Sequence, residues 1–197
     1  MDLVAPRRPR SQRWRPLTAG EIAMASLLFR DAIDYRRVRI FSRRYLPYLQ
    51  PKNCAMTPNG SMYFHRSCFL DDYAEASIAG KHWFMHEMVH VWQHQLGYAV
   101  RLRGAVRLGL PYHYDLAAGN SLADYNMEAQ GDLLADYFVL KHLQTVLSMR
   151  QPRYAHSVVL YEQVLADFLA RPASRTNLPR DVGRLLTWIK RGKPQEK

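Results

Sequence analysis

The chain has 197 residues, of which 48% are hydrophobic, and a formal net charge of +11. This length fits one domain with a substantial core, and the lack of any run of about eighteen apolar residues excludes a membrane-spanning helix. Residues 1–16 carry five arginines and three prolines without the apolar stretch of a Sec signal peptide. We therefore predict a flexible basic arm over residues 1–16, a single domain over 17–190 and a disordered tail over 191–197.

The excess of positive charge favours anionic partners such as nucleic acid, an anionic lipid, a cell-wall polymer or an acidic protein. The basic residues are spread along the chain, with clusters at residues 7–15, 36–44 and 101–107. This spread suits a generic solubilising surface as well as a docking role. We do not expect nucleic acid to be the partner.

A helix and two strands are predicted first along the chain. Residues 18–29 open with Thr18-Ala19-Gly20-Glu21, the pattern of a capping box, and continue as an apolar helix. Basic and apolar residues alternate over residues 37–41, which predicts a strand. Prolines at 47, 51 and 58 mark a loop. Residues 61–69 predict a second strand. Cys54 and Cys68 could form a disulfide in an oxidising compartment or remain thiols.

The next predicted helix, residues 81–97, carries the motif His86-Glu87-x-x-His90. It has no proline and no glycine before Gly97, and apolar residues recur in it at helical spacing. Residues four apart share one helix face, so the two imidazoles can bind one metal ion while Glu87 takes a proton from a bound water. The alternative is a buried helix with two incidental histidines.

A catalytic zinc site has three protein ligands and an open position. Residues 122–149 predict a second helix, on which Glu128 and Asp132 share a face. Glu128 can bind the metal, and Asp132 can accept a hydrogen bond from the outer N–H of a ligating histidine. The alternative is a solvated acidic face, which the neighbouring motif disfavours. His94 is a poorer third ligand, because three ligands on one straight helix cannot converge.

Residues 98–120, between the two helices, contain three glycines and a proline and predict a loop or short hairpin over the site. Peptide hydrolysis needs a hydrogen-bond donor for the oxyanion. Tyr112, His113 and Tyr114 supply donors here, and we favour Tyr114 or His113, with a packing role as the alternative. Tyr125 is a lesser candidate.

Two further helices complete the predicted elements: a long one over residues 154–170 and a short one over 179–190, with Trp188 packed inward. The elements together predict a compact, helix-dominated α+β fold with a small sheet and the HExxH motif on a central helix.

The pattern His86-Glu87-x-x-His90 followed by Glu128-x-x-x-Asp132 resembles that of gluzincins, the thermolysin-like zinc peptidases. The amino-acid sequence at residues 86–95, 112–116 and 123–128 resembles that of bacterial metallopeptidase domains associated with type VI secretion spike (valine-glycine repeat) and Rhs proteins. This second resemblance covers roughly residues 36–140. Met127 stands where the thermolysin pattern has asparagine.

The resemblance implies a zincin-like fold, with zinc bound by His86, His90 and Glu128. It also implies that Glu87 is the general base and Asp132 the orienting carboxylate. Residues 61–65 would form an edge strand that pairs with an extended substrate.

We therefore predict a zinc-dependent endopeptidase. By the resemblance it is an antibacterial type VI secretion effector, made in the bacterial cytoplasm without a Sec signal and acting in the periplasm of a target cell. The expected partners are a peptide or protein substrate, a secretion spike protein and an acidic immunity protein. One alternative is a zinc-dependent peptidoglycan amidase or cross-link peptidase. The other is a non-catalytic basic binding domain with a structural zinc, against which Glu87 argues, because structural sites are usually closed by four ligands.

Overall fold

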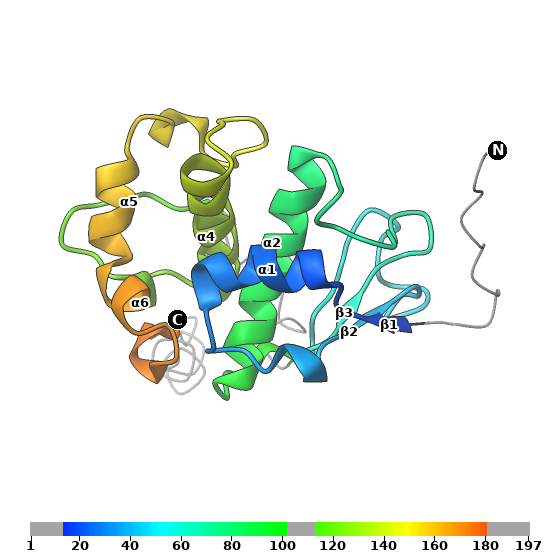
Figure 1. The fold of residues 1–197 in the computed structure, drawn as a ribbon. Helices are drawn as coiled ribbons and strands as arrows, with labels where there is room; N and C mark the ends of the chain where they lie inside the picture. Colours follow the sequence, from blue (N-terminus) through cyan, green and yellow to red (C-terminus); the bar gives the residue numbers. More distant parts are fainter. Residues whose placement is uncertain (1–13, 102–112, 181–197) are drawn as a thin grey trace, which may run out of the picture.

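The computed structural model describes residues 14–101 and 113–180. Two long helices, α2 (Ile78–Gln95) and α4 (Met127–His142), pack against each other at its centre. Helix α1 (Ala19–Phe29) crosses α2, and a small sheet lies on the side of α2 away from α4 (Figure 1). The short helices α5 (Val158–Val164) and α6 (Ala166–Ala170) lie beyond α4. The predicted helix-dominated α+β class with a small sheet is confirmed.

Helix α1 begins as predicted. The side chain of Thr18 accepts a hydrogen bond from the backbone N–H of Glu21, and the carboxylate of Glu21 accepts one from that of Thr18. Glu21 is fully buried and accepts two further bonds from the guanidinium of Arg15, at 2.8 and 2.7 Å. This buried pair fixes the strand before the helix to the helix itself.

That strand, β1 (Trp14–Pro16), changes the predicted extent of the N-terminal arm. It pairs antiparallel with β2 (Arg39–Phe41), so residues 14–16 belong to the fold. Residues 1–13, the rest of the predicted arm, lie outside the described residues. The strand predicted over residues 37–41 starts later than expected, because η1 (Tyr35–Arg37) is a 3-10 turn.

The second predicted strand, residues 61–69, is wrong in length: only β3 (Met62–Tyr63) forms, parallel to β2. The chain turns directly afterwards, where the backbone N–H of Cys68 bonds to the carbonyl of His65. The free edge implied for substrate pairing is also occupied at Tyr63, because its N–H and C=O both bond to Met56 of the same chain. An extended substrate therefore cannot pair with the backbone of Tyr63 in this arrangement.

Helix α2 begins three residues earlier than predicted, where Ser77 caps its N-terminus, and Gly97 follows its end with a φ of +87°. The backbone is left-handed at this position, a conformation that commonly follows a helix end and that glycine adopts without strain. The second metal helix is shorter than predicted: η2 (Leu122–Asp124) is a separate 3-10 turn, and Asn126 caps α4. The predicted end at residue 149 is wrong, because α4 ends at His142.

The third predicted helix, residues 154–170, is divided. It is preceded by η3 (Pro152–Tyr154), and α5 and α6 are separated at Leu165. A last 3-10 turn, η4 (Arg175–Asn177), follows. The helix predicted over residues 179–190, including Trp188, and the predicted tail lie outside the described residues, apart from residues 179 and 180.

The core joins all these helices. Phe29 of α1, Trp92 of α2 and Phe168 of α6 contact one another at ring-centroid distances of 5.4 to 6.2 Å, and all three are fully buried. In the part of the chain that the structure describes, no helix is long and apolar enough to cross a membrane. Cys54 and Cys68 are both thiols here.

Candidate metal centre

Helix α2 places the two histidines of the motif. Because residues 86 and 90 are one turn apart, their imidazoles leave the helix on the same side. Their Nε2 atoms lie 3.1 Å apart, and both residues are buried. The sequence pattern thus becomes a pair of converging ring nitrogens.

Glu128, in the first turn of α4, completes a triangle of ligand atoms. Its Oε2 lies 3.3 Å from Nε2 of His86 and 3.4 Å from Nε2 of His90. The side chain of Asn126 accepts hydrogen bonds from the backbone N–H groups of Glu128 and Ala129, which fixes the start of α4 at this place. The structure therefore brings together the three predicted ligands from two helices.

The dimensions of this triangle fit a zinc ion. Tetrahedral zinc with bonds of about 2.0–2.1 Å keeps its ligand atoms about 3.3 Å apart. The three separations here are 3.1, 3.3 and 3.4 Å. Two nitrogens and a carboxylate oxygen are also ligands that zinc accepts, so the residues present suit a three-ligand zinc site.

The outer nitrogens of both imidazoles are held by hydrogen bonds. Nδ1 of His86 lies 2.8 Å from Oδ1 of Asp132, as predicted, and Nδ1 of His90 lies 2.8 Å from Oε1 of Gln93. The amide nitrogen of Gln93 donates to Oε1 of Gln130, so its oxygen must face His90. Both rings consequently hold a proton on Nδ1 and turn Nε2 toward Glu128.

Sequence reasoning missed Gln93, although a signal for it exists. The residue lies three positions after His90 on the same helix and therefore shares its face. It is fully buried. An amide on the helix face of a candidate ligand can hold the outer nitrogen of that ligand, so the spacing itself is the signal for a positioning role.

The site attracts positive charge. Burial alone would lower the pKa of His86, but hydrogen bonds and charge from Asp132 and Glu128 raise it to about 10. Burial would raise the pKa of Glu128, but the two imidazoles hold it well below its usual range. Two carboxylates beside two buried imidazoles thus create a site that favours a cation.

Helix α4 approaches His86 closely because residue 131 is a glycine. A Cβ atom added to Gly131 would lie only 2.6 Å from Cε1 and 2.8 Å from Nδ1 of His86. Real Cβ contacts are essentially never so short. The absence of a side chain here is therefore a condition for the observed position of the imidazole.

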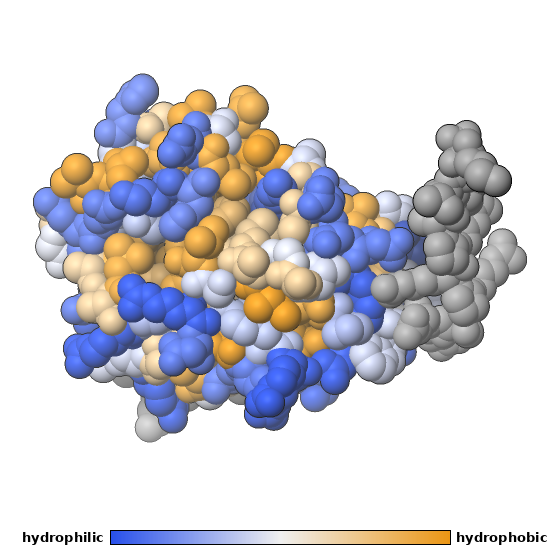
Figure 2. All heavy atoms as spheres, in the orientation of Figure 1, coloured by the Kyte–Doolittle hydropathy of each residue, from blue (hydrophilic) through white to orange (hydrophobic). Residues whose placement is uncertain are grey.

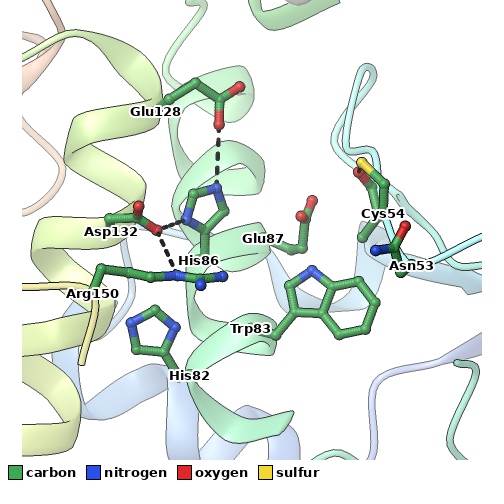
Figure 3. Close-up of a pocket in the computed structure, with 10 residues that line it drawn as sticks. Asn53, Cys54, His82, Trp83, His86, Glu87, Glu128, Asp132 and Arg150 are labelled. Atoms are coloured by element: carbon green, nitrogen blue, oxygen red, sulfur yellow. Dashed lines mark hydrogen bonds and ion pairs between the residues drawn. The ribbon is translucent and has the colours of Figure 1, made fainter. Parts of the chain in front are cut away.

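Glu87 and two of the three candidate ligands, His86 and Glu128, border a cavity of about 360 Å³. Glu87 is buried, and one carboxylate oxygen accepts a hydrogen bond of 2.5 Å from the hydroxyl of Thr57. In Figure 3 its carboxylate points into the space between the ligand group and the loop that carries Asn53 and Cys54. Glu87 thus faces the same cavity as His86 and Glu128. The cavity is lined by Asn53, Cys54, Ala55, His82, Trp83, His86, Glu87, Glu128, Asp132 and Arg150.

The structure does not bring Tyr114 to this cavity. Its hydroxyl lies 2.5 Å from both Oδ2 of Asp136 and the hydroxyl of Tyr161, and the residue is buried. Burial and the charge of Asp136 raise the pKa of Tyr114 above its usual range. The placement is at odds with an oxyanion-donor role, and Tyr114 is a core residue.

His113, the other predicted donor, lies on the surface. Its ring contacts the side chains of Gln151 and Arg153, at 2.6 and 3.0 Å, and it does not line the cavity. The lesser candidate, Tyr125, donates its hydroxyl proton to the carbonyl of Asp115. The third tyrosine of the predicted donor set, Tyr112, lies outside the described residues.

Arg150 is a cationic side chain that lines the cavity, and no local sequence pattern indicates this role. Its Nε lies 3.9 Å from Oδ1 of Asp132, while most of its guanidinium is exposed. Its position depends on Asp136, a fully buried carboxylate that accepts bonds from the backbone N–H groups of Arg150 and Gln151, at 2.7 and 2.9 Å. The same carboxylate lies 2.7 Å from Nε2 of His82.

The fold and the sequence both resemble a bacterial effector. The solved structure of the effector domain of Pseudomonas aeruginosa VgrG2b is similar with a TM-score of 0.63 and 39% identity, over 75% of this chain and 85% of that one. The type VI secretion system spike protein VgrG2b of P. aeruginosa is 42% identical over 141 residues, which are 68% of this chain and 14% of the spike protein. No protein-family model matches. The chain belongs to the family of the VgrG2b effector domain.

Proposed function

We propose that this chain is a zinc-dependent metallopeptidase that acts as a type VI secretion effector. The observation that carries the enzymatic part is the triangle of His86, His90 and Glu128, with separations of 3.1 to 3.4 Å, beside a cavity that Glu87 also faces. A purely structural zinc would be closed by a fourth protein ligand and would not need a neighbouring base.

The mechanism divides between the ion and the chain. Zinc bound at this site would supply Lewis acidity, which lowers the pKa of a water and polarises a carbonyl. Glu87 accepts the proton of the attacking water and delivers it to the leaving nitrogen. The bond from Thr57 occupies one oxygen of Glu87 and leaves the other to accept the proton.

We assign the oxyanion contact to Arg150, in place of the predicted Tyr114 and His113. Its guanidinium lines the cavity, and its backbone is anchored to α4 through Asp136. A cationic hydrogen-bond donor at this position stabilises the negative charge that develops on the carbonyl oxygen.

The secretion role rests on kinship with the VgrG2b effector domain. The chain spans only 14% of the spike protein VgrG2b, so delivery on a spike and an acidic immunity partner are proposals. A net charge of +11 suits an acidic inhibitor. The proposed place of action is the periplasm of the target cell.

The test compares wild type with Glu87→Gln, using Glu75→Gln, a change of an exposed glutamate, as the matched control. All three proteins should bind about one zinc per chain, but only Glu87→Gln should fail to hydrolyse an unfolded protein such as casein. Purified peptidoglycan is the second substrate, and cleavage of peptidoglycan alone would replace the endopeptidase with a wall hydrolase. Equal activity of wild type and Glu87→Gln on both substrates would refute the enzyme.

The place of action is tested by producing wild type and Glu87→Gln in bacteria, each with and without an export signal. Growth should stop only when the wild-type chain is exported. Toxicity without export would move the target to the cytoplasm.

A further inference from the structure

One segment of the chain is basic without any acidic residue. Residues 35–70 contain seven cationic residues and neither aspartate nor glutamate: Arg36, Arg37, Arg39, Arg43, Arg44, Lys52 and Arg66. Within the described residues, the last four of these form no ion pair. Their charge is therefore available to an external anion.

Three of these cations lie near enough to His65 for their charges to act on its imidazole. After burial, the charges of Arg44, Lys52 and Arg66 are the causes that lower the pKa of His65. Arg43 lies beside them along the chain, with its guanidinium carbon 5.2 Å from the ring centre of Phe41. The charges of Arg44, Lys52 and Arg66 thus act on one place, and Arg43 is their neighbour in the chain.

The turn between these cations presents apolar side chains to solvent. Tyr48 is 97% exposed, and Leu49 is 80% exposed. The neighbouring Leu46 is 38% exposed. Single exposed leucines are ordinary on a protein surface, and the face drawn in Figure 2 shows hydrophobic and hydrophilic residues interspersed. The basic segment differs from such a mixed surface, because one aromatic side chain and two leucines lie on the same turn beside four cations.

The turn is ordered by internal hydrogen bonds. Gln50 is buried, its amide oxygen accepts from the backbone N–H of Tyr45, and its amide nitrogen donates to the carbonyls of Cys54 and Tyr63. Arg44 donates to the carbonyl of Pro47 at 2.7 Å. The base of the turn is thus fixed to the sheet, while its apolar tip stays outside.

We propose that this basic turn, defined as residues 43–52 with Arg66, docks the protein on an anionic lipid surface. Apolar and aromatic side chains enter the boundary between headgroups and acyl chains, and the flanking cations bind the lipid phosphates. Each cation near an anionic membrane adds to the attraction. An acidic protein would use the cations but would leave the fully exposed Tyr48 without a clear role.

Docking in this way would set the lipid surface beside the candidate metal centre. Asn53, Cys54 and Ala55 directly follow the basic turn and line the cavity (Figure 3). The segment appears in cyan after β2 in Figure 1. Lipid binding does not depend on hydrolysis, so it should survive in Glu87→Gln even if the proposed function is wrong.

The test is co-sedimentation of the full chain with vesicles of phosphatidylcholine, with and without phosphatidylglycerol. Wild type should bind only the vesicles that contain phosphatidylglycerol, and about 0.5 M salt should weaken the binding. Tyr48→Ser/Leu49→Ser should bind at least about tenfold more weakly, because both apolar contacts are lost. Arg43→Gln/Lys52→Gln should bind more weakly as well.

The matched control is Leu147→Ser/Val159→Ser, which changes two side chains that are 63% and 69% exposed elsewhere on the protein. This variant should bind like wild type. Wild-type binding by Tyr48→Ser/Leu49→Ser would overturn the proposal. So would a wild-type chain that binds soluble polyglutamate but no vesicle, because the basic turn would then serve an acidic polymer.

Discussion

The substitution Gly131→Ala tests whether the close approach of α4 to His86 makes the metal site. The new Cβ would lie 2.6, 2.8 and 2.9 Å from Cε1, Nδ1 and Nε2 of the imidazole. Non-bonded carbon atoms prefer about 3.5–4.0 Å, so the ring has to move by roughly 1 Å. Asp132 and Glu128 hold the ring from other directions, so it cannot move without losing their contacts.

The expected effect is larger on zinc than on stability. A ligand shift of roughly 1 Å exceeds the tolerance of about 0.2 Å in metal–ligand distances. Zinc affinity should fall by at least about 10–100-fold, which is the usual effect of losing a residue that supports a metal ligand. Overpacking costs about 1–3 kcal/mol, and the higher helix propensity of alanine offsets about 1 kcal/mol of it.

The assay is zinc titration against a competing chelator, with thermal unfolding of the same samples. The control is Val164→Ala, which shortens a buried side chain of α5 and should cost stability, by about 2 kcal/mol, without weakening zinc. If Gly131→Ala bound zinc as tightly as wild type, either His86 would not be a ligand or the helices would not be so close.

Four further outcomes are expected. Gln93→Leu should lower zinc affinity by about 10–100-fold, measured by the same titration, because the outer nitrogen of His90 loses its acceptor. Arg150→Met should lower kcat on casein by about 100-fold or more with little change in KM. A fall in kcat accompanied by a rise in KM of similar size would indicate a structural effect. Asp136→Asn should lower the free energy of unfolding in urea by about 3 kcal/mol, since a buried acceptor of several bonds is replaced. Burial raises the pKa of Tyr35 to about 12. The phenol of the unfolded chain loses its proton at lower pH, near pH 10. The contribution of Tyr35 to the free energy of unfolding is therefore full below about pH 10 and is lost as the pH rises toward 12. The urea midpoint of Tyr35→Phe should therefore fall less between pH 9 and pH 11 than that of wild type, and equal falls would contradict the assignment.

The parts of the site that could be read from the sequence are those set by local helix geometry. Spacing of four residues places His86 beside His90, and the same spacing places Asp132 one turn after Glu128. The structure brings the two pairs together as expected. The apolar spacing predicted the buried face of α2, and the Thr18–Glu21 pattern predicted the capping box of α1. Both signals depend on residues that are close in the chain.

The parts that were mispredicted depend on contacts between distant residues. Alternation in the sequence cannot show that the hydroxyl of Tyr114 meets Asp136, or that Arg150 returns to the cavity after α4 ends. The length of the second strand was mispredicted for the same reason, because it is limited by the turn after Tyr63 and by the pairing of Tyr63 with Met56.

The hydrogen bonds of the buried amides run in one direction. His90 donates to Gln93, Gln93 to Gln130, and Gln130 to the carbonyl of Asn177 in η4, each at 2.8 to 3.0 Å. Reversal of one amide would set two donors or two acceptors face to face, so the orientation of every member is fixed by its neighbour. The chain of bonds thus links a candidate ligand at residue 90 to a turn 87 positions later, and a recombinant fragment that stopped short of residue 177 would remove one of the two carbonyls that hold the amide of Gln130.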